Sequence, residues 1–428
     1  MTAVPEIESV EAFAARARVW LADHMPPAAP RRASEDAALS PDERELRRLT
    51  RCRELQRTLF DGGFAGICVP REYGGQGLTP EHQDAFNREI ADYDYPADTQ
   101  VPTFSPCMAV ILEFGTDEQK RRHVPRILRG ETYWMQLLSE PSGGSDVAGA
   151  LTSAVRDGDE WVLNGSKIWT TGAWWADWGL CLARTNWDVP KHRGLTVFML
   201  ALHQPGIEIH RIEMLNGSRE FCQEFLTDVR VPDADRLGEV DEGWTVGTRW
   251  MYHERAVSAG SIYVTAPAGV PAVALEALDP GGGAAGLVRL ARERGVLGDR
   301  SVRERIGESH ALALIGDALR DRIAEDIRSG AASQHASAVN RLWYGATGVR
   351  KATIAFEVGG QSAVAWSDEE DDVGRIGVRF LMRQAACIGG GTTEMSRNVV
   401  SERVLGMPRE RTEDREIPFR DVPRAPPT

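Results

Sequence analysis

The sequence has few of the residues that mark a disulfide-linked or zinc-binding protein. Its 428 residues include six cysteines, and no two of them form a C-x-x-C pair. This scatter argues against a disulfide scaffold, a zinc ribbon and a thioredoxin-like motif. We therefore expect reduced cysteines, mostly buried as small apolar side chains, and no metal site.

Basic residues and long apolar runs are also in short supply. There are 50 Lys and Arg against 63 Asp and Glu, which gives a net charge of -13. Because binding to a phosphate backbone needs a basic field, nucleic acid is not expected as a partner. No apolar run approaches the length of a membrane span. The N-terminal stretch lacks the basic start of a secretory signal, so a cytoplasmic protein is expected.

Nucleotide-binding motifs are absent or out of context. No G-x-x-x-x-G-K-[ST] occurs, so nucleotide hydrolysis has no support. The stretch "GGGAAG" at 281–286 matches G-x-G-x-x-G in spacing, but it follows the helix-like run "VPAVALEALDP". Because a dinucleotide site needs a strand before this motif, a flexible loop is the preferred interpretation.

Three patterns of residues follow one another along the chain. The first part has apolar residues at three- and four-residue spacing, which is typical of amphipathic helices. Short β-rich runs then alternate with turns such as Asn164-Gly165, which indicate hairpins. Helical spacing returns after Gly243 and ends before a Pro-rich stretch. The predicted segments are a helical domain (1–135), a β domain (136–240), a helical bundle (241–410) and a mobile tail (411–428).

The stretch "QLLSEPSGGSDVAG" (136–149) joins a strand-like start to a turn rich in hydroxyl and backbone N–H groups. Such a turn suits a large anionic cofactor. With "NGSKIWTTGAWWADWGLCLART" and "RVPDADRLGEVDEGW", in this order and at this spacing, it resembles the acyl-CoA dehydrogenase family. The resemblance covers most of the chain and extends to "VPREYGGQGL", "FGTDEQKRRHVPRILRGE" and "LMRQAACIGGGTTEM".

The resemblance implies a fold, a cofactor and an assembly. Family members have an N-terminal helical domain, a central β-barrel-like domain and a C-terminal four-helix bundle, which is an α+β multidomain fold. They bind FAD between the β domain and the bundle, usually in dimers of dimers in which a neighbouring subunit completes the site. We therefore expect FAD and a homo-oligomer, either a dimer or a tetramer.

The resemblance assigns cofactor contacts in the β domain. Gln136 resembles a strand residue facing the isoalloxazine, and Ser139 the hydroxyl on the pyrimidine edge of the flavin. Ser145 resembles the pyrophosphate contact. Trp169 matches the aromatic residue against the flavin, and Thr171 the hydroxyl near N5. For each residue the alternative is a turn or core position.

Further contacts are implied in the C-terminal part. Gly359 and Gly360 resemble a pair that lets the backbone approach the adenosine half of a partner's FAD, because small residues permit close approach. Thr392 and Glu394 correspond to positions that also touch the cofactor. The family often has Arg-x-Thr-Phe-Gly after the first bundle helix, whereas this chain has "RERGVLG". Arg294 is expected to keep the arginine's role there, without the hydroxyl and the aromatic residue that follow it in relatives.

The catalytic base is displaced from its common position. Oxidising a saturated acyl thioester needs a carboxylate with a raised pKa, donors on the thioester oxygen and exclusion of water. Many relatives carry the base as a Glu before the Gly-Thr of the C-terminal loop, where this chain has Gly390. A second family solution places a Glu before an Arg on the first bundle helix. Glu254, followed by Arg255, matches it.

On a helix, Glu254 shares a broad face with Trp244, Gly247 and Met251, so apolar neighbours are expected to raise its pKa. Arg255 points about 100° away, and its expected role is to orient the loop or the cofactor. The Gly390 N–H is expected to donate to the thioester oxygen.

The expected function is α,β-dehydrogenation of an acyl-CoA thioester, with electrons passed to an electron-transfer flavoprotein. An acyl-carrier-protein thioester stays open as the substrate, as do linear, branched and ring-bearing acyl groups. Two other interpretations also stay open. One is a flavin oxidase or monooxygenase on the same fold, and the other is a non-catalytic partner subunit of a mixed tetramer, which the altered "RERGVLG" segment suggests.

Overall fold

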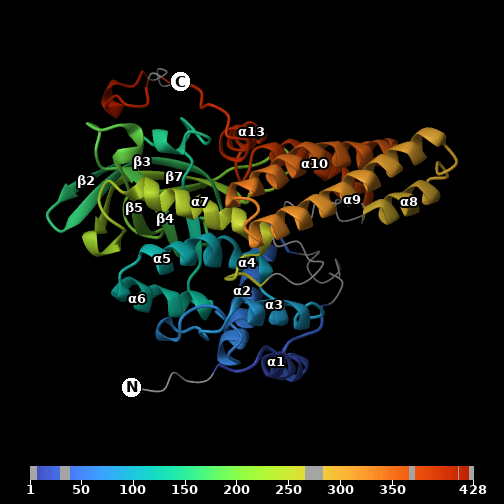
Figure 1. The fold of residues 1–428 in the computed structure, drawn as a ribbon, viewed down its shortest axis with the longest axis horizontal. Coiled ribbons are helices and arrows are strands. Elements are labelled where there is room, and N and C mark those ends of the chain that lie inside the picture. The colour runs from blue at the N-terminus through green and yellow to red at the C-terminus, as the bar shows by residue number, and fades with distance from the viewer. Residues whose placement is uncertain (1–6, 29–38, 266–282, 366–371, 413, 424–428) are drawn as a thin grey trace. The chain divides into compact units, whose positions relative to one another are not determined.

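A computed structural model of the chain describes residues 7–28, 39–265, 283–365, 372–412 and 414–423 (Figure 1). The chain forms two compact units. The first comprises residues 1–213, 219–272 and 412–428, and the second 214–218 and 273–411. Within the described residues, no helix combines the length and the apolar character needed to cross a membrane.

The first unit begins with helices, and capping residues in the sequence mark the start of α2. Ser40 and Glu43 form a reciprocal capping box at the start of α2, and Pro41 occupies its first turn. Phe13, Phe64 and Phe86 lie in the core between the helices. The helices are α1 (Val10–His24), α2 (Pro41–Asp61), α3 (Pro80–Glu89), α4 (Ala97–Pro102), α5 (Ala109–Phe114) and α6 (Asp117–Leu128), with the irregular turn η2 (Thr103–Met108) before α5.

One eight-stranded sheet follows the helices in the first unit. Its strand order is β6-β7-β3-β2-β4-β5-β8, an open path, and β1 adds to β4 in parallel. The sheet has its own apolar core, which includes Trp161, Phe198 and Leu226. The strands are β1 (Trp134–Leu137), β2 (Ser153–Asp157), β3 (Glu160–Thr171), β4 (Trp178–Arg184), β5 (Leu195–Ala201), β6 (Ile207–Arg211), β7 (Phe221–Pro232) and β8 (Arg236–Leu237).

Helix α7 (Gly243–Gly260) packs on this sheet, against β5 and β4, and on α5 and η2. It opens the predicted third segment, yet its contacts group it with the first unit. The same holds for the end of the chain. Residues Phe419–Asp421 form a short helical turn, η9, and Phe419 is 3% exposed. This part of the predicted mobile tail is therefore anchored, while residues 413 and 424–428 lie outside the described residues.

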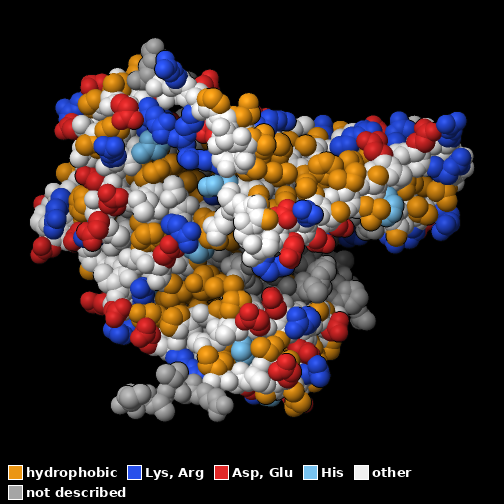
Figure 2. Space-filling model, viewed as in Figure 1, with side chains coloured by type: hydrophobic (Ala, Val, Ile, Leu, Met, Phe, Trp, Pro, Cys, Tyr) orange, Lys and Arg blue, Asp and Glu red, His pale blue; other side chains and the backbone are white. Residues whose placement is uncertain are grey.

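The second unit is helical. Helix α10 packs against α9, α12 and α13, and α8 packs against α9. Figure 2 shows hydrophobic side chains gathered along these helices; on α9, Leu314 and Ile315 are 55% and 49% exposed. The helices are α8 (Gly283–Glu293), α9 (Arg300–Arg328), α10 (Ser337–Gly359), α11 (Gln361–Val364), α12 (Asp372–Met382) and α13 (Thr393–Val399). The order helical, sheet, helical confirms the α+β fold predicted from the sequence.

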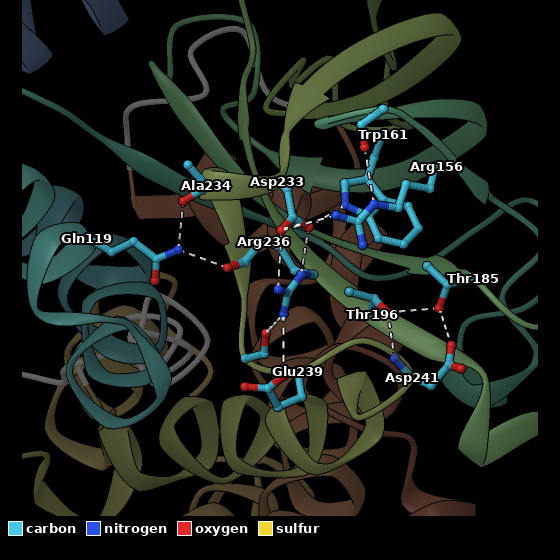
Figure 3. A network of polar contacts seen from close by, with 12 residues as sticks. Gln119, Arg156, Trp161, Thr185, Thr196, Asp233, Ala234, Arg236, Glu239 and Asp241 are labelled. Atoms are coloured by element: carbon cyan, nitrogen blue, oxygen red, sulfur yellow. Dashed lines mark hydrogen bonds and ion pairs between the residues drawn. The ribbon is translucent and has the colours of Figure 1, made fainter.

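A buried amide joins α6 to the end of the sheet. The Gln119 side chain donates to the carbonyl oxygens of Ala234 and Arg236, both at 2.8 Å (Figure 3). Its own amide oxygen accepts from the Thr116 N–H at 2.9 Å. Arg236 in turn pairs with Asp233 at 2.9 Å. One side chain thus caps a helix and satisfies two carbonyls, with Gln119 only 4% exposed.

This geometry predicts that Gln119→Glu destabilises the protein although it is nearly isosteric. A carboxylate can still accept from Thr116 N–H, but it cannot donate to the two carbonyls, so we expect a loss of about 1–3 kcal/mol. Urea unfolding would measure it. The exposed neighbour Glu118→Gln serves as the control and should stay within about 0.5 kcal/mol of wild type. An equally small effect of Gln119→Glu would contradict the two donor bonds.

Candidate active site

Strand β1 and the loop that follows it bring two predicted groups together. Gln136 lies opposite Leu180 of β4, in the parallel register. Beyond the strand, the Ser139 carbonyl accepts from the Ile168 N–H at 3.0 Å. Ile168 directly precedes Trp169 on β3. The residues predicted around 136–145 and 169–171 therefore lie side by side, although they are 30 positions apart.

The loop after Ser139 is a tight and exposed turn. Glu140 and Gly143 exchange two backbone hydrogen bonds, at 2.9 and 3.1 Å. Gly144 has open space on its Cβ side, with only the Ser139 hydroxyl nearby at 3.7 Å from a Cβ placed there. Ser145 is exposed. The loop thus presents hydroxyl and backbone groups to solvent, as an anion-binding loop must.

Trp169 is held in an unusual conformation. It interrupts the β3–β7 register as a bulge between Ile168 and Thr170, and its φ is +67°. A bulky residue rarely adopts this left-handed region, and such strain gathers at functional sites. The indole is 51% exposed and meets the edge of Phe221 at 5.9 Å. Thr171 beside it is also exposed, whereas Thr170 points into the sheet.

A buried ion pair lies directly beneath these residues. The Lys167 ammonium is wholly buried and donates to Glu140 Oε1 at 2.8 Å. It also donates to the Leu182 carbonyl at 2.6 Å and to the Leu138 carbonyl at 3.3 Å. Burial alone would raise the pKa of Glu140, but the charge and hydrogen bond of Lys167 hold that pKa below its usual value. All three ammonium donors are satisfied, so the charge is stable inside the sheet.

Glu140 holds the far end of its own loop as well. Its carboxylate accepts from the backbone N–H groups of Leu151 at 2.6 Å and Thr152 at 3.0 Å. The segment between Glu140 and Leu151 contains the exposed turn with Ser145. Both ends of this loop are thereby tied to one carboxylate.

Glu224 is a second buried carboxyl group in the sheet. Its hydrogen bond comes from a hydroxyl and not from the Lys167 ammonium. Glu224, opposite Lys167 on β7, is fully buried and accepts from the Thr170 hydroxyl at 2.9 Å. Its other oxygen has no hydrogen-bond partner among the described residues. Burial raises the pKa of Glu224 to about 8, against the hydrogen bond from Thr170 and the charge of Lys167. At neutral pH this side chain is therefore mostly the neutral acid.

Helix α7 is fastened to β1 by a single side-chain bond. The Trp250 Nε1–H donates to Gln136 Oε1 at 2.6 Å, and the indole is fully buried. Glu254 follows Trp250 by four positions, so it lies on the same face one turn later. The Glu254 side chain is half-buried.

The charge of Glu254 acts on the buried thiol of Cys107 in η2. Burial, and next the negative charge of Glu254, hold the pKa of the Cys107 thiol well above its usual value. Glu254 is thus a half-buried carboxylate one turn from a buried indole.

Three further contacts hold the same stretch of α7. The Ser105 hydroxyl donates to the His253 carbonyl at 2.9 Å. Glu113 of α5 accepts from Arg249 at 2.7 Å and lies 3.0 Å from His253 Nε2. Burial lowers the pKa of His253, against the attraction of Glu113. The turn of the helix that precedes Glu254 is therefore held in place, and Arg255 is exposed.

In the second unit, the glycine loop is shaped by left-handed backbone. Gly390 and Gly391 have φ of +71° and +94°, a region that a Glu side chain would strongly disfavour. Arg341 of α10 donates to the Gly389 carbonyl at 2.6 Å. Thr392 caps α13, where its hydroxyl accepts from the Met395 N–H at 3.1 Å.

Glu394 lies in the first turn of α13 and is exposed. Its pKa is lowered by hydrogen bonds to its own backbone and to Thr393. The loop packs tightly on α10 because Gly345 leaves room for it. A Cβ on Gly345 would come within 2.6 Å of the Thr393 methyl group.

Three other predicted residues meet in this unit. Gly360, with φ of +55°, ends α10, and a Cβ there would lie 2.5 Å from the Arg294 guanidinium. That guanidinium donates to the Val358 carbonyl. Gly359 is buried at the same helix end. The structure therefore joins Arg294 to the glycine pair across 66 positions.

The predicted residues thus fall into two groups, one in each unit. Sequence reasoning missed the buried Lys167, Glu140 and Glu224, although the first two lie inside quoted motifs. The available signal was position: Lys167 occupies an inward-facing place in a strand whose alternate residues are apolar. It also missed the bond from Trp250 to Gln136, for which neither residue carries a local signal.

An exposed aromatic side chain and a hydroxyl-rich loop lie on the sheet, and a helix packed against the sheet carries a carboxylate. This combination is typical of an enzyme that binds a planar, anionic cofactor. Comparison with known proteins names the family. Residues 8–131 match the acyl-CoA dehydrogenase N-terminal domain, and residues 136–229 match the middle domain. The chain is 33% identical to "Acyl-CoA dehydrogenase IpdE1" of Mycobacterium tuberculosis, over 94% of this chain and 99% of that protein.

Solved structures agree. The "Tcur3481-Tcur3483 steroid ACAD" has a TM-score of 0.69 at 26% identity and covers 95% of this chain and 99% of its own. The ChsE4-ChsE5 complex from Mycobacterium tuberculosis has a TM-score of 0.68 at 25% identity, over 96% and 100%. The chain therefore belongs to the acyl-CoA dehydrogenase family of flavoproteins, oxidoreductases that act on CH–CH groups. The family predicted from the sequence is confirmed.

The buried pair predicts a large and non-additive stability effect. Lys167→Met leaves the Glu140 carboxylate buried without its cation, so we expect a loss of about 3–5 kcal/mol in urea unfolding. The double variant Lys167→Met/Glu140→Gln removes both charges and should be more stable than the single variant. A double variant that loses the full sum of both single losses would contradict the pairing.

Glu224 predicts a pH dependence of stability with a definite sign. Its pKa is about 8 in the folded protein against an ordinary 4.5, so the folded state retains a proton that the unfolded chain releases. This contribution is fully present below pH 4.5 and is lost as the pH rises through 8. Wild type should therefore lose stability relative to Glu224→Gln between these pH values. The exposed control Glu11→Gln should track wild type, and parallel curves for Glu224→Gln would contradict the buried neutral acid.

Proposed function

We propose that the protein catalyses flavin-dependent α,β-dehydrogenation of an acyl-CoA thioester, with Glu254 as the base that takes the α-proton. The observation that carries this proposal is the bond from Trp250 to Gln136. It connects the strand that leads into the predicted flavin loop to the helix that bears the carboxylate, within one compact unit. A base and a flavin platform held on one rigid frame are what proton abstraction coupled to hydride transfer requires.

The residues of the first unit fit FAD. Trp169 offers a half-exposed flat apolar surface, and the Thr171 hydroxyl lies beside it at the strand end. Ser139 is joined to the same place through Ile168. An isoalloxazine ring has this mixture of a flat apolar body and polar edge. When bound, FAD would accept the hydride from the β-carbon at N5.

Each FAD is proposed to be shared between two subunits. The first unit of one subunit would hold the pyrophosphate, and the second unit of the neighbouring subunit would hold the adenosine half. The exposed loop at Ser145 supports pyrophosphate binding through hydroxyl and N–H donors. In the second unit, Arg294 with Gly359 and Gly360 is proposed to receive the adenosine half of a neighbouring subunit's FAD. Thr392, whose hydroxyl oxygen caps α13, is proposed to contact the cofactor as well.

Other residues are assigned supporting roles. The Glu254 pKa is proposed to be raised by partial burial on α7, which favours proton abstraction near neutral pH. The Gly390 N–H is proposed to donate to the thioester oxygen. Glu394 is proposed to contact the cofactor, and Arg255 to orient the loop or cofactor.

Substrate and partners are proposed from the relatives. One solved relative is named a steroid ACAD, which favours a ring-bearing acyl group among the classes considered. Glycine at 390 supports this choice because it leaves space near the α-carbon. An electron-transfer flavoprotein is the proposed acceptor, and a cytoplasmic location is proposed with it. A carrier-protein thioester is the alternative substrate.

A second candidate is a subunit of a mixed tetramer. The solved relatives named above include a complex of two different chains. Val296 and Leu297 pack against the helical core of the second unit where many relatives carry Thr and Phe. The exposed apolar side chains of α9 are suited to an oligomer interface of either kind (Figure 2).

The test is anaerobic bleaching of the flavin by a panel of linear, branched and ring-bearing acyl-CoA thioesters. Wild-type protein loaded with FAD should bleach with at least one of them. Glu254→Gln should bleach about 10²–10⁴-fold more slowly because the general base is removed. Glu239→Gln, an exposed carboxylate of the same unit, should bleach like wild type.

The outcomes separate the candidates. Bleaching by Glu254→Gln at the wild-type rate would remove the assigned base. Flavin that does not bleach with any member of the panel, unless a related chain is added, would point to the mixed assembly. Rapid oxygen consumption after bleaching would instead favour an oxidase.

A further inference from the structure

The C-terminal segment of the chain is docked on the β domain of its own unit. The Phe419 N–H donates to the Val189 carbonyl at 2.9 Å, and the Arg420 N–H to the Trp187 carbonyl at 3.0 Å. Phe419 is 3% exposed, and its ring lies 5.5 Å from that of Trp187. Arg420 also pairs with Asp188. A chain end held by paired backbone bonds and a buried ring is specifically anchored.

Phe419 covers a buried guanidinium. Arg184, at the end of β4, is fully buried, and its Cζ lies 3.7 Å from the centre of the Phe419 ring. The guanidinium donates to the carbonyls of Ala148 at 2.6 Å and Ala150 at 3.0 Å. It also donates to the Lys191 carbonyl at 3.1 Å. In a desolvated place such a cation–π contact and three carbonyl bonds reinforce one another.

The same loop is held a second time by Lys191. Its ammonium lies 3.0 Å from Asp146, which directly follows Ser145, and 3.6 Å from Asp414 of the C-terminal segment. The Lys191 side chain is 16% exposed. Two cations, Arg184 and Lys191, therefore bridge the C-terminal segment to residues 146–150.

We infer that residues 414–421 form an intramolecular strap that acts through Arg184 and Lys191 to hold the hydroxyl-rich loop 141–150 in its binding conformation. Phe419 is then a positioning residue. This inference rests on the proposed function, in which that loop receives the pyrophosphate of FAD. The strap orders the loop before the cofactor binds. An ordered loop binds more tightly, because binding then does not include the entropic cost of ordering it.

The strength of the bonds from Arg184 to the loop depends on the exclusion of water. While Phe419 covers Arg184, the ring shields the guanidinium from water, and its donors stay on the three backbone carbonyls. Once the ring is removed, water can solvate the guanidinium and compete for Ala148 and Ala150. The turn Val147–Gly149 then loses the bonds that hold its carbonyls, and the loop before it becomes freer to move.

The test compares Phe419→Ala with Phe419→Tyr and with Glu416→Ala in the full chain. Phe419→Tyr keeps an aromatic face over Arg184, and Glu416 is an exposed residue of the same segment. Amide hydrogen exchange of peptides covering 141–152 is measured in flavin-free protein. We expect exchange at least about tenfold faster in Phe419→Ala and near wild type in the other two.

The second measurement is the dissociation constant of FAD, obtained by titration of flavin-free protein. We expect it to rise roughly tenfold in Phe419→Ala, while the bleaching rate at saturating FAD stays within about twofold of wild type. A merely structural role would lower the melting temperature without this split between affinity and rate.

Failure of the strap and failure of the proposed function give different results. Unchanged exchange at 141–152, with faster exchange confined to residues 414–423, would overturn the strap whatever the flavin does. Wild-type protein that does not bind FAD would overturn the proposed function, and the exchange data would still decide whether the strap holds the loop. Faster exchange with an unchanged FAD dissociation constant would overturn the positioning role of Phe419.

Discussion

The ammonium of Lys167 is the interaction on which the rest of the candidate site depends. It binds the Leu138 carbonyl just after β1, the carboxylate of Glu140 and the Leu182 carbonyl of β4. Trp169 follows Lys167 by two positions, so its exposed indole stands on the same strand that the ammonium secures. A buried ammonium is tolerated only if each of its N–H donors has an acceptor. The three segments that supply these acceptors are therefore held in fixed positions around it.

The proposed catalytic base is held by a separate set of contacts. Common relatives carry it in the glycine loop, but the loop here is bent through left-handed glycines at Gly390 and Gly391, which suits glycine and strains a glutamate. The carboxylate sits instead on α7, which packs with the sheet in one unit and is held by Trp250 and Gln136. The proposed base would therefore be positioned by packed elements of regular structure and not by a loop.

Much of the fold could be predicted, because periodicity records which face of an element is buried. The helical start of the chain, the hairpin turns and the order of the three parts follow from patterns that repeat every two or three to four residues. The family and the residues at 136–145, 169–171 and 254 follow from motifs. The anchoring of Phe419 could not be predicted, since a Pro-rich end has the same composition whether it docks or not.

The elements, their order, the family and the residue types available for chemistry can be read from the sequence, because they depend on local spacing and on motifs that lie within short stretches. Which of those residues meet depends on how the chain folds. Lys167 and Glu140 are 27 positions apart, Gln136 and Trp250 114, and Arg184 and Phe419 235. Whether a charge is paired, and therefore tolerable when buried, depends on contacts across such separations, and local spacing does not encode them.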